Sequence, residues 1–216
     1  MITNYATLRT EVAGTAKQSW SHRSDILGKF DTYLQLAQEE MYQGVYVTGD
    51  PQGLRVRDLI TTDTATLSTS VRTLAHPTGL LEYRKLQLSQ TDAYYPPLQY
   101  KTPHELTVYD SAGRPNFYTI TSQLEFERVA DVAYTLNRVY YAKLTDLSST
   151  QTTHAVLTRF PSIFLYGCLY QMAKWVRNRE LGSDYANLFQ GAINSANAED
   201  VEIGPTPQMR YMDACV

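Results

Sequence analysis

The sequence predicts an α+β protein: a helical bundle that contains an inserted antiparallel β region and ends in an extended C-terminal tail. Near both ends of the chain, apolar residues recur every three or four positions, as one face of a helix requires. Between these stretches, Thr, Val, Tyr and Leu alternate with polar residues, which is typical of half-buried strands. Residues 198–216 show no such period and contain two prolines and several acids, which indicates an acidic, extended tail.

Residues 1–50 are predicted to form a helical hairpin with a short loop. The apolar face of its first helix is formed by residues at three- and four-residue spacing, namely Tyr5, Leu8, Val12, Ala16 and Trp20. Thr3 or Asn4 is placed to cap the start of this helix. The second helix is expected to have Ser24 as its N-cap and to stop at Gly44, because glycine readily adopts the conformations that end helices.

Residues 54–146 are predicted to form the β-rich insert, in which prolines and glycines separate the strands. A single alternation over LLEYRKLQL places Leu81 and Tyr83 on the face opposite Leu86 and Leu88. NFYTITSQLEFER indicates two short strands around residues 121–123. In DVAYTLNRVYYAKL the alternation places Val132, Tyr134, Leu136 and Arg138 on one face.

Residues 152–197 are predicted to complete the bundle with two helices. In QTTHAVLTRFPSIFLYGCLYQMAKW, Pro161 fits the first turn of a helix, where its missing N–H costs little, and His154 lies in the linker ahead of it. The buried face is expected to contain Val156, Phe160, Phe164, Gly167, Cys168, Gln171 and Trp175, with Gly167 allowing close helix approach. Ser183 is expected to cap the last helix, which ends near Asn197.

The formal net charge of −3 is concentrated at the C-terminus. Residues 198–216 account for all of it, because they contain Glu199, Asp200, Glu202 and Asp213 against Arg210 alone. A neutral body without a basic stripe argues against a general nucleic-acid binder that is held by phosphate contacts. No apolar run is long enough to span a bilayer, and no signal peptide is expected.

No catalytic motif is found in the sequence. Phosphate-binding loops, the GxSxG elbow and HExxH are absent, and the four histidines are isolated from one another, so no metal and no cofactor is predicted. Cys168 falls in the middle of an apolar helix face, where a thiol is normally inert. Glu125 and Glu127 point the same way on a strand, about 7 Å apart, which leaves a cell-wall glycosidase as a less favoured alternative.

Tyrosine is unusually frequent, with 17 copies. Tyrosine is enriched at interfaces, because it offers a wide apolar ring with a polar tip, but it also favours half-buried strands, and both interpretations stay open. The residues predicted to bind partners are Tyr140 and Tyr141 in the insert and Met209, Tyr211 and Met212 in the tail. The tail is expected to dock on a partner or on a neighbouring copy, and one way to do so is to add a strand to a sheet edge.

The order of these segments resembles that of the head-to-tail adaptor proteins of short-tailed bacteriophages, also called head completion or neck proteins. TNYATLRTEVAGTAKQSW and HRSDILGKFDTYLQLAQEEMYQGVYV are similar to the opening helical pair of that family, and LAHPTGLLEYRKLQL to its proline and strand segment. AGRPNFYTITSQLEFERVADVAYTLNRVYYAKLTDLSSTQTTHAVLTRFPSIFLYGCL is similar to its succession of Gly-x-Pro, three strands, Leu-Ser linker and proline-started helix. The resemblance covers about residues 3–195; it departs at ERVADVA, where the family has prolines, and at Ser162, where many members have an acid.

The resemblance implies a structural virion protein rather than an enzyme. It implies a subunit of a connector ring, expected to be a dodecamer, in the neck between capsid and tail. The implied partners are the portal protein, tail or nozzle proteins, other copies of this chain, and double-stranded DNA that passes without specific binding during genome ejection; no membrane is implied. A wall without fixed positive charge suits that passage, because it does not retain phosphates. The protein would be made in the host cytoplasm, and a stopper or nozzle subunit remains the alternative.

Overall fold

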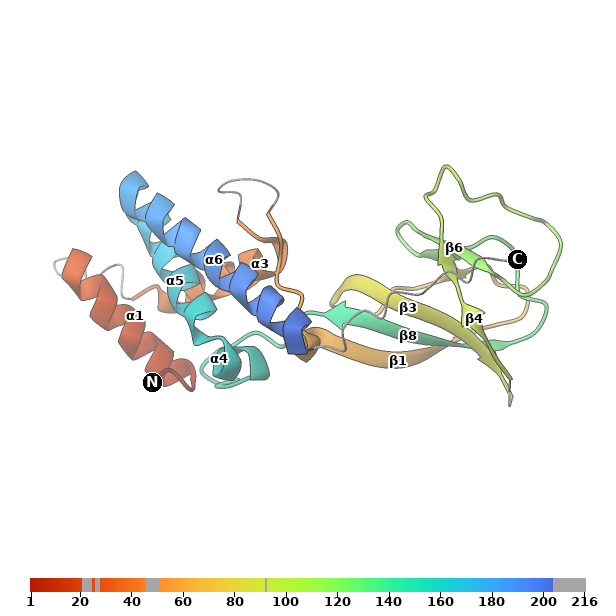
Figure 1. The fold of residues 1–216 in the computed structure, drawn as a ribbon, viewed down its shortest axis with the longest axis horizontal. Coiled ribbons are helices and arrows are strands. Elements are labelled where there is room, and N and C mark those ends of the chain that lie inside the picture. The colour runs from red at the N-terminus through yellow and green to blue at the C-terminus, as the bar shows by residue number, and fades with distance from the viewer. Residues whose placement is uncertain (21–24, 26–27, 46–50, 92, 204–216) are drawn as a thin grey trace, which may run out of the picture. The chain divides into compact units, whose positions relative to one another are not determined.

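A computed structural model of the chain describes residues 1–20, 25, 28–45, 51–91 and 93–203 (Figure 1). The contacts divide the chain into two compact units. The helical unit comprises Met1–Asp58 and Thr145–Val216, and the β unit comprises Leu59–Leu144. The mixed α+β composition is therefore confirmed, and the β unit lies between two helical segments in the sequence.

The N-terminal part of the helical unit contains helix α1 (Tyr5–Trp20) and helix α3 (Phe30–Gln43). Asn4 caps α1, because its side-chain oxygen accepts a hydrogen bond from the Thr7 N–H at 2.9 Å. The predicted apolar face is confirmed for Tyr5, Leu8, Val12 and Ala16, which are all buried. Gly44 ends α3 at φ 80°, and its N–H donates to the Glu40 carbonyl oxygen. The Trp20 side chain and the predicted cap Ser24 lie outside the described part of the chain.

The first of the two helices predicted after the β unit is divided into α4 (Ala155–Arg159) and α5 (Pro161–Val176). Phe160 separates them at φ −128° and ψ 60°, because Pro161 disfavours helical backbone in the residue before it. Pro161 occupies the first turn of α5, as predicted. His154 is the N-cap of α4 rather than a plain linker residue: its Nδ1 accepts from the Leu157 N–H at 3.2 Å.

Helix α5 is the helix that α1, α3, α4 and α6 all contact. Its buried residues include Phe164, Gly167, Cys168 and Gln171, as predicted. The prediction was wrong for Trp175, which is 50% exposed because it lies at the C-terminal end of α5 beyond the packed stripe. Lys29 covers the Trp175 ring, with its Nζ 3.7 Å from the ring centroid.

The last helix, α6, spans Arg179–Ile203 and is longer than predicted at both ends. Asn178 caps it by accepting from the Leu181 N–H at 3.1 Å, so Ser183 lies inside the helix and is not its cap. At the other end, residues 198–203 are helical, which corrects the prediction that the extended tail begins at residue 198. The rest of the predicted tail, residues 204–216, lies outside the described part of the chain.

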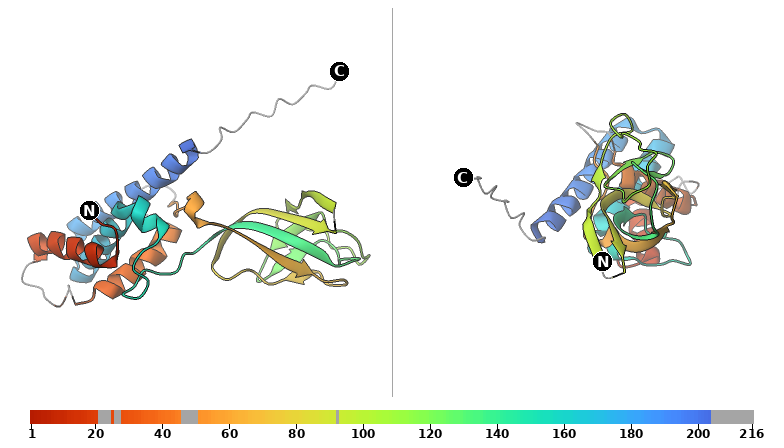
Figure 2. Two further views of the ribbon diagram at one scale, coloured as in Figure 1. Left: turned by 90° about the horizontal axis from the view of Figure 1, so that it is seen from below. Right: turned by 90° about the vertical axis from the view of Figure 1, so that its right-hand side faces the viewer.

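The β unit contains a four-stranded antiparallel sheet in the order β1-β8-β3-β4. The strands are β1 (Ile60–Leu67), β3 (Leu80–Gln90), β4 (Ala93–Pro97) and β8 (Tyr134–Ala142), and Figure 2 shows β1, β8 and β3 side by side. The register shifts in β3 between Tyr83 and Lys85. This bulge turns Tyr83, Leu86 and Leu88 toward the same core, so the single alternation predicted for β3 was wrong.

A second sheet has the order β2-β7-β6-β5 and is built from short strands. They are β2 (Thr73–Leu74), β5 (Gln99–Tyr100), β6 (Phe117–Ile120) and β7 (Leu124–Phe126), so the two strands expected around residues 121–123 are confirmed. β5 and β6 pair in parallel, an exception within the mostly antiparallel region that was predicted. Residues of both sheets form one core, namely Leu67, Leu86, Leu88, Leu98, Tyr118, Leu124, Phe126, Ala130, Tyr134 and Leu136.

An ion pair is embedded in the core-facing side of the first sheet. The guanidinium of Arg138 on β8 donates from Nε and Nη2 to the two carboxylate oxygens of Asp63 on β1, both at 2.6 Å. The Arg138 side chain is 9% exposed and the Asp63 side chain 32%. The hydrogen bonds that Arg138 donates to Asp63 raise the pKa of Arg138 above its usual value. Asp63 thus neutralises Arg138, the one charged residue predicted on the buried face of β8.

Among the described helices, none combines the length and the apolar character that crossing a membrane requires.

Candidate interaction surfaces

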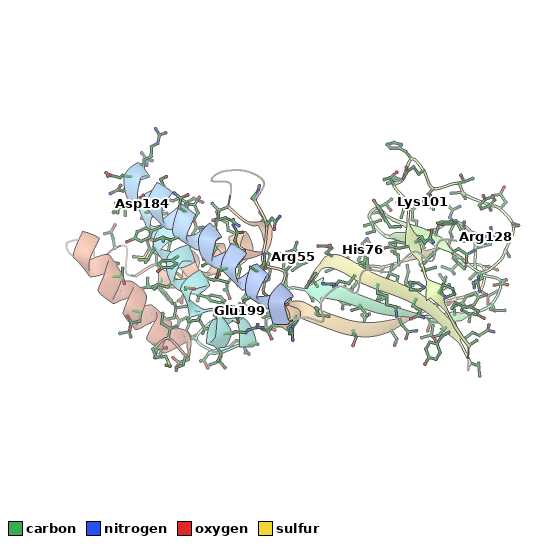
Figure 3. The ribbon with its side chains drawn as sticks, in the orientation of Figure 1. Arg55, His76, Lys101, Arg128, Asp184 and Glu199 are labelled. Carbon is green, nitrogen blue, oxygen red and sulfur yellow. The ribbon has the colours of Figure 1, made fainter. Side chains whose placement is uncertain are left out.

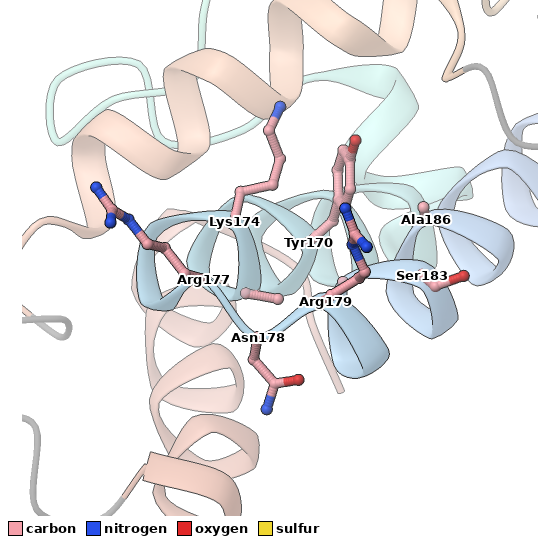
Figure 4. Close-up of a pocket in the computed structure, with 9 residues that line it drawn as sticks. Tyr170, Lys174, Arg177, Asn178, Arg179, Ser183 and Ala186 are labelled. Carbon is pink, nitrogen blue, oxygen red and sulfur yellow. The ribbon is translucent and has the colours of Figure 1, made fainter.

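The turn between α5 and α6 forms an open hollow of about 600 Å³ in the helical unit (Figure 4). The backbone of the turn is closed by two hydrogen bonds, from Arg177 N–H to the Lys174 oxygen and from Asn178 N–H to the Ala173 oxygen. Arg177 adopts the left-handed conformation at φ 59°, which a residue other than glycine adopts only at a cost of about 1 kcal/mol. The turn therefore presents an arginine where glycine would be more stable.

Basic side chains surround this hollow. Figure 4 shows Arg177 and Arg179 projecting from the two helix ends, with Asn178 between them. Both arginines are exposed, and neither has an ion-pair partner among the described residues. Lys174 is paired instead, because its Nζ lies 2.8 Å from a carboxylate oxygen of Glu40 on α3. The tip of the α5–α6 hairpin thus offers two uncompensated guanidinium groups, which suit carboxylates or phosphates of a partner.

A second polar arrangement fixes α6 against the chain that leads into the β unit. Gln190 donates to the Gln52 carbonyl at 2.9 Å, and its oxygen accepts from the Val45 N–H at 2.7 Å. About two turns further along α6, Asn197 donates to the Gly53 carbonyl at 3.1 Å and accepts from the Arg55 N–H at 2.8 Å. These amide groups satisfy backbone groups of an extended segment that has no strand partner of its own.

The same face of α6 ends in an ionic cluster, and Figure 3 marks Arg55 and Glu199 in this region. Asp200 accepts from the Arg57 N–H at 2.8 Å and from its Nε at 3.1 Å. Arg159 of α4 lies 3.2 Å from Asp200, 3.3 Å from Asp58 and 3.3 Å from Glu199. Two of the four acids assigned to the tail, Glu199 and Asp200, are therefore paired with arginines of the helical unit.

The β unit carries the exposed tyrosines of the described chain. Tyr94 on β4 is 78% exposed and Tyr100 on β5 is 51% exposed. Tyr109 and Val108 follow in the loop after β5, with 45% and 47% exposure. Exposed tyrosines of this kind are the residues that interfaces favour.

Of the residues predicted to bind partners, Tyr140 and Tyr141 are placed inside the β unit. They are 5% and 7% exposed, and the Tyr140 hydroxyl lies 3.3 Å from a carboxylate oxygen of Asp63. A partner would therefore reach little of either ring, and the exposed rings of Tyr94 and Tyr100 are better placed. Met209, Tyr211 and Met212 lie outside the described residues, so their role stays a prediction.

Glu125 and Glu127, the pair considered for a glycosidase, have separate surroundings. Glu125 accepts a hydrogen bond from the Thr121 hydroxyl at 2.7 Å near the strand surface. Glu127 is 3% exposed and accepts from the Asn116 N–H at 2.9 Å. Glu127 lines a small hollow of about 200 Å³ together with Lys101 and Tyr109, and Glu125 does not. The structure does not bring the two carboxylates together at one cavity.

The remaining candidate groups are structural in their contacts. Cys168 is fully buried, and burial raises the pKa of its thiol, which keeps it protonated and unreactive. Burial also lowers the pKa of His154, which keeps the imidazole neutral and its Nδ1 able to accept the α4 cap hydrogen bond. Within the described residues no three His, Cys, Asp or Glu side chains gather in a way that would hold a metal ion.

Comparison with protein families decides the class of protein. The family model described as SU10 adaptor protein matches residues 3–210. The chain belongs to the SU10 adaptor protein family. It is thus a phage adaptor protein, as the order of its segments indicated, and the family match includes part of the tail as well as both units. No curated protein matches the chain.

Sequence reasoning missed the basic tip and the polar face of α6. The tip is visible in the sequence as RNR at residues 177–179, a short turn between two helical periods, but nothing local indicates that Arg177 takes a glycine conformation. The polar face is visible as Gln190, Asn197 and Asp200 at roughly helical spacing. Their partners lie more than a hundred residues away, so the pattern reads as a solvated face until the fold is known.

Proposed function

We propose that this adaptor is a ring-forming subunit of the virion neck that joins the portal at the capsid vertex to the tail. The observation that carries the proposal is the family match over residues 3–210. A ring, expected to be a dodecamer, needs two different contact surfaces on each copy, since head-to-tail contacts close only when each surface meets its complement. The basic tip of the helical unit and the exposed tyrosines of the β unit offer two surfaces of different chemistry for contacts with other copies, the portal or the tail.

The passage of double-stranded DNA through the ring is also part of the proposal. The chain carries a net charge of −3. Near the C-terminal end of α6, Arg57 and Arg159 are paired with acids. A ring wall with a net negative charge would pass DNA without binding it, because that charge does not attract the phosphates.

The experiment that tests the proposal mixes the purified full-length chain with portal rings of the same phage and examines the mixture by electron microscopy. The proposal expects a second ring of density stacked on one face of the portal. An Arg177→Glu/Arg179→Glu variant, compared with a Glu180→Gln variant as an exposed neighbour, tests whether the basic tip faces the portal.

A stopper or nozzle subunit is the second candidate, since both share the neck and differ only in position. Density that appears on the tail side of an existing adaptor ring, with no binding to isolated portals, would contradict the adaptor proposal and support this second candidate.

A further inference from the structure

The four sheet edges of the β unit differ in how they are protected. An exposed edge strand invites pairing with another chain, and proteins protect such edges with short strands, prolines, bulges or lysines. β4 contains Pro96 and Pro97 and has a register shift against β3 between Gln87 and Ser89. β2 and β5, the edges of the second sheet, each have two residues. Three of the four edges therefore carry a recognised protective feature.

β1 is the exception. It is an eight-residue edge strand that pairs with β8 in one continuous register, from Ile60 opposite Tyr141 to Leu67 opposite Tyr134, without a shift. Its sequence, ITTDTATL, has no proline, glycine, lysine or arginine. Its one charge, Asp63, is bound by Arg138 and does not shield the edge. No described strand pairs with the free side of β1.

The side chains around this edge are also suited to strand addition. Thr62, Thr64 and Thr66 are exposed on the face opposite the core. Threonine favours the strand conformation and forms favourable cross-strand pairs through its methyl group and hydroxyl. An incoming strand would meet an uncharged face whose desolvation costs little, together with a row of backbone N–H and C=O groups.

We propose that the free edge of β1 takes up residues 208–215 from the C-terminal tail of a second copy of this chain, as an added strand. The tail starts after Ile203, and residues 204–216 can span about 43 Å when extended. Pro205 and Pro207 cannot donate ladder hydrogen bonds, so pairing would begin at residue 208. From there to the end no proline or glycine interrupts the chain, and the length matches that of β1.

The alternation of the tail fits the two faces of β1. In an added strand, Met209, Tyr211 and Asp213 share one face. An antiparallel register with Met209 opposite Leu67 places Tyr211 opposite Ala65, so that both apolar side chains extend the core. Donor and acceptor are different surfaces, so each copy would give its tail to one neighbour and receive a tail from the other, which closes a ring. The inference rests on the proposed ring but names the contact that builds it.

The test compares the self-association of full-length variants by analytical ultracentrifugation, alone and with portal rings. Thr64→Lys places a charge on the free edge, and Thr135→Lys is its control on the same face of the central strand β8. Tyr211→Pro blocks strand pairing in the tail, and Thr206→Pro is its control ahead of the paired residues. We expect the association constant to fall at least tenfold for Thr64→Lys and Tyr211→Pro and to change less than twofold for the controls.

Mixing the two impaired variants gives the decisive result. The Thr64→Lys copy still has an intact tail and the Tyr211→Pro copy an intact edge, so the mixture should form one-to-one dimers that do not grow into rings. Hydrogen exchange of residues 60–67 should slow in these dimers only on the Tyr211→Pro copy. The inference would be overturned if the mixed dimer did not form, or if test and control variants lost association equally. It would also be overturned if β1 of the wild type were protected from hydrogen exchange independently of protein concentration.

Failure of this inference and failure of the proposed function give different results. If wild-type protein and the edge variants assemble equally well on portals, the edge inference is wrong and the adaptor role stands. If no variant binds portals but the mixed dimers form as described, the edge contact stands and the position in the neck is wrong.

Discussion

Substituting Gly167 with Ala tests how closely α5 packs against its neighbours. A Cβ added at Gly167 would lie 3.0 Å from the Ala37 Cβ and 3.1 and 3.2 Å from the Phe189 Cε2 and Cζ. Ordinary carbon contacts lie at about 3.5–4.0 Å, so three contacts would be too short by about half an ångström. Ala37 is 2% exposed and Phe189 is 0% exposed, so neither can move toward solvent.

The magnitude follows from two opposing contributions. Overpacking a dense core by one methyl group costs about 1–3 kcal/mol. Replacing glycine by alanine inside a helix returns about 1 kcal/mol through propensity. We therefore expect Gly167→Ala to reduce the free energy of unfolding by about 1 kcal/mol, within a range of about 0–2 kcal/mol set by these two contributions.

Gly191 supplies the matched control. It lies inside α6, and an added Cβ would meet nothing within 4 Å. Gly191→Ala should stabilise the protein by about 0.5–1 kcal/mol, since only the propensity contribution applies. Urea unfolding followed by tryptophan fluorescence measures both variants, because Trp20 and Trp175 belong to the helical unit. If Gly167→Ala stabilised the protein as much as Gly191→Ala, the close approach of α3 and α6 to α5 would be refuted.

Three further predictions follow from other contacts. Asp63→Ala should destabilise the β unit by about 2–4 kcal/mol, because it leaves the buried guanidinium of Arg138 without a counter-ion. Adding Arg138→Met should recover part of that loss in thermal unfolding, and no recovery would contradict the buried pair. Burial lowers the pKa of His154, so its contribution to stability is complete above the unfolded pKa of about 6.5 and is lost as pH falls toward the folded pKa. The urea midpoint should therefore fall less between pH 7.5 and 5.5 for His154→Asn than for wild type. His104→Asn is the exposed control. Arg177→Gly should stabilise the helical unit by up to about 1 kcal/mol, since glycine relieves the strain of the left-handed backbone at φ 59°. Arg177→Ala should not stabilise it, and calorimetry of the two variants separates these results.

The sequence predicts well those elements whose signal lies within their own residues. The stripe of α1 from Tyr5 to Ala16, the start of α5 at Pro161 and the alternation of β8 all appear as expected. For α1 and β8 the more buried residues recur at the period of the element, so periodicity carries the information, whereas the start of α5 follows from the fixed backbone of Pro161.

The features that the sequence did not predict depend on contacts between distant segments. The last turns of α6 persist because Asp200 is bound by Arg57, 143 residues away in the sequence, and no local signal reports that contact. The bulge in β3 lets Tyr83 and Leu86 share a core, which a strict two-residue period cannot describe. The exposure of individual tyrosines was the hardest feature to predict, since an aromatic residue in a strand has the same local pattern whether it faces the core or solvent.

The tyrosines show how burial separates the two roles that were left open. Three of them bind aspartates inside their own unit: Tyr5 with Asp31, Tyr134 with Asp131 at 2.7 Å, and Tyr140 with Asp63 at 3.3 Å. Burial raises the pKa of each of these hydroxyls, and that of Tyr134 reaches about 12, so they stay protonated and donate these hydrogen bonds. The exposed tyrosines of the described chain, by contrast, lie at positions 94, 100 and 109 of the β unit. Among the described tyrosines, those that are accessible to a partner therefore lie in the β unit.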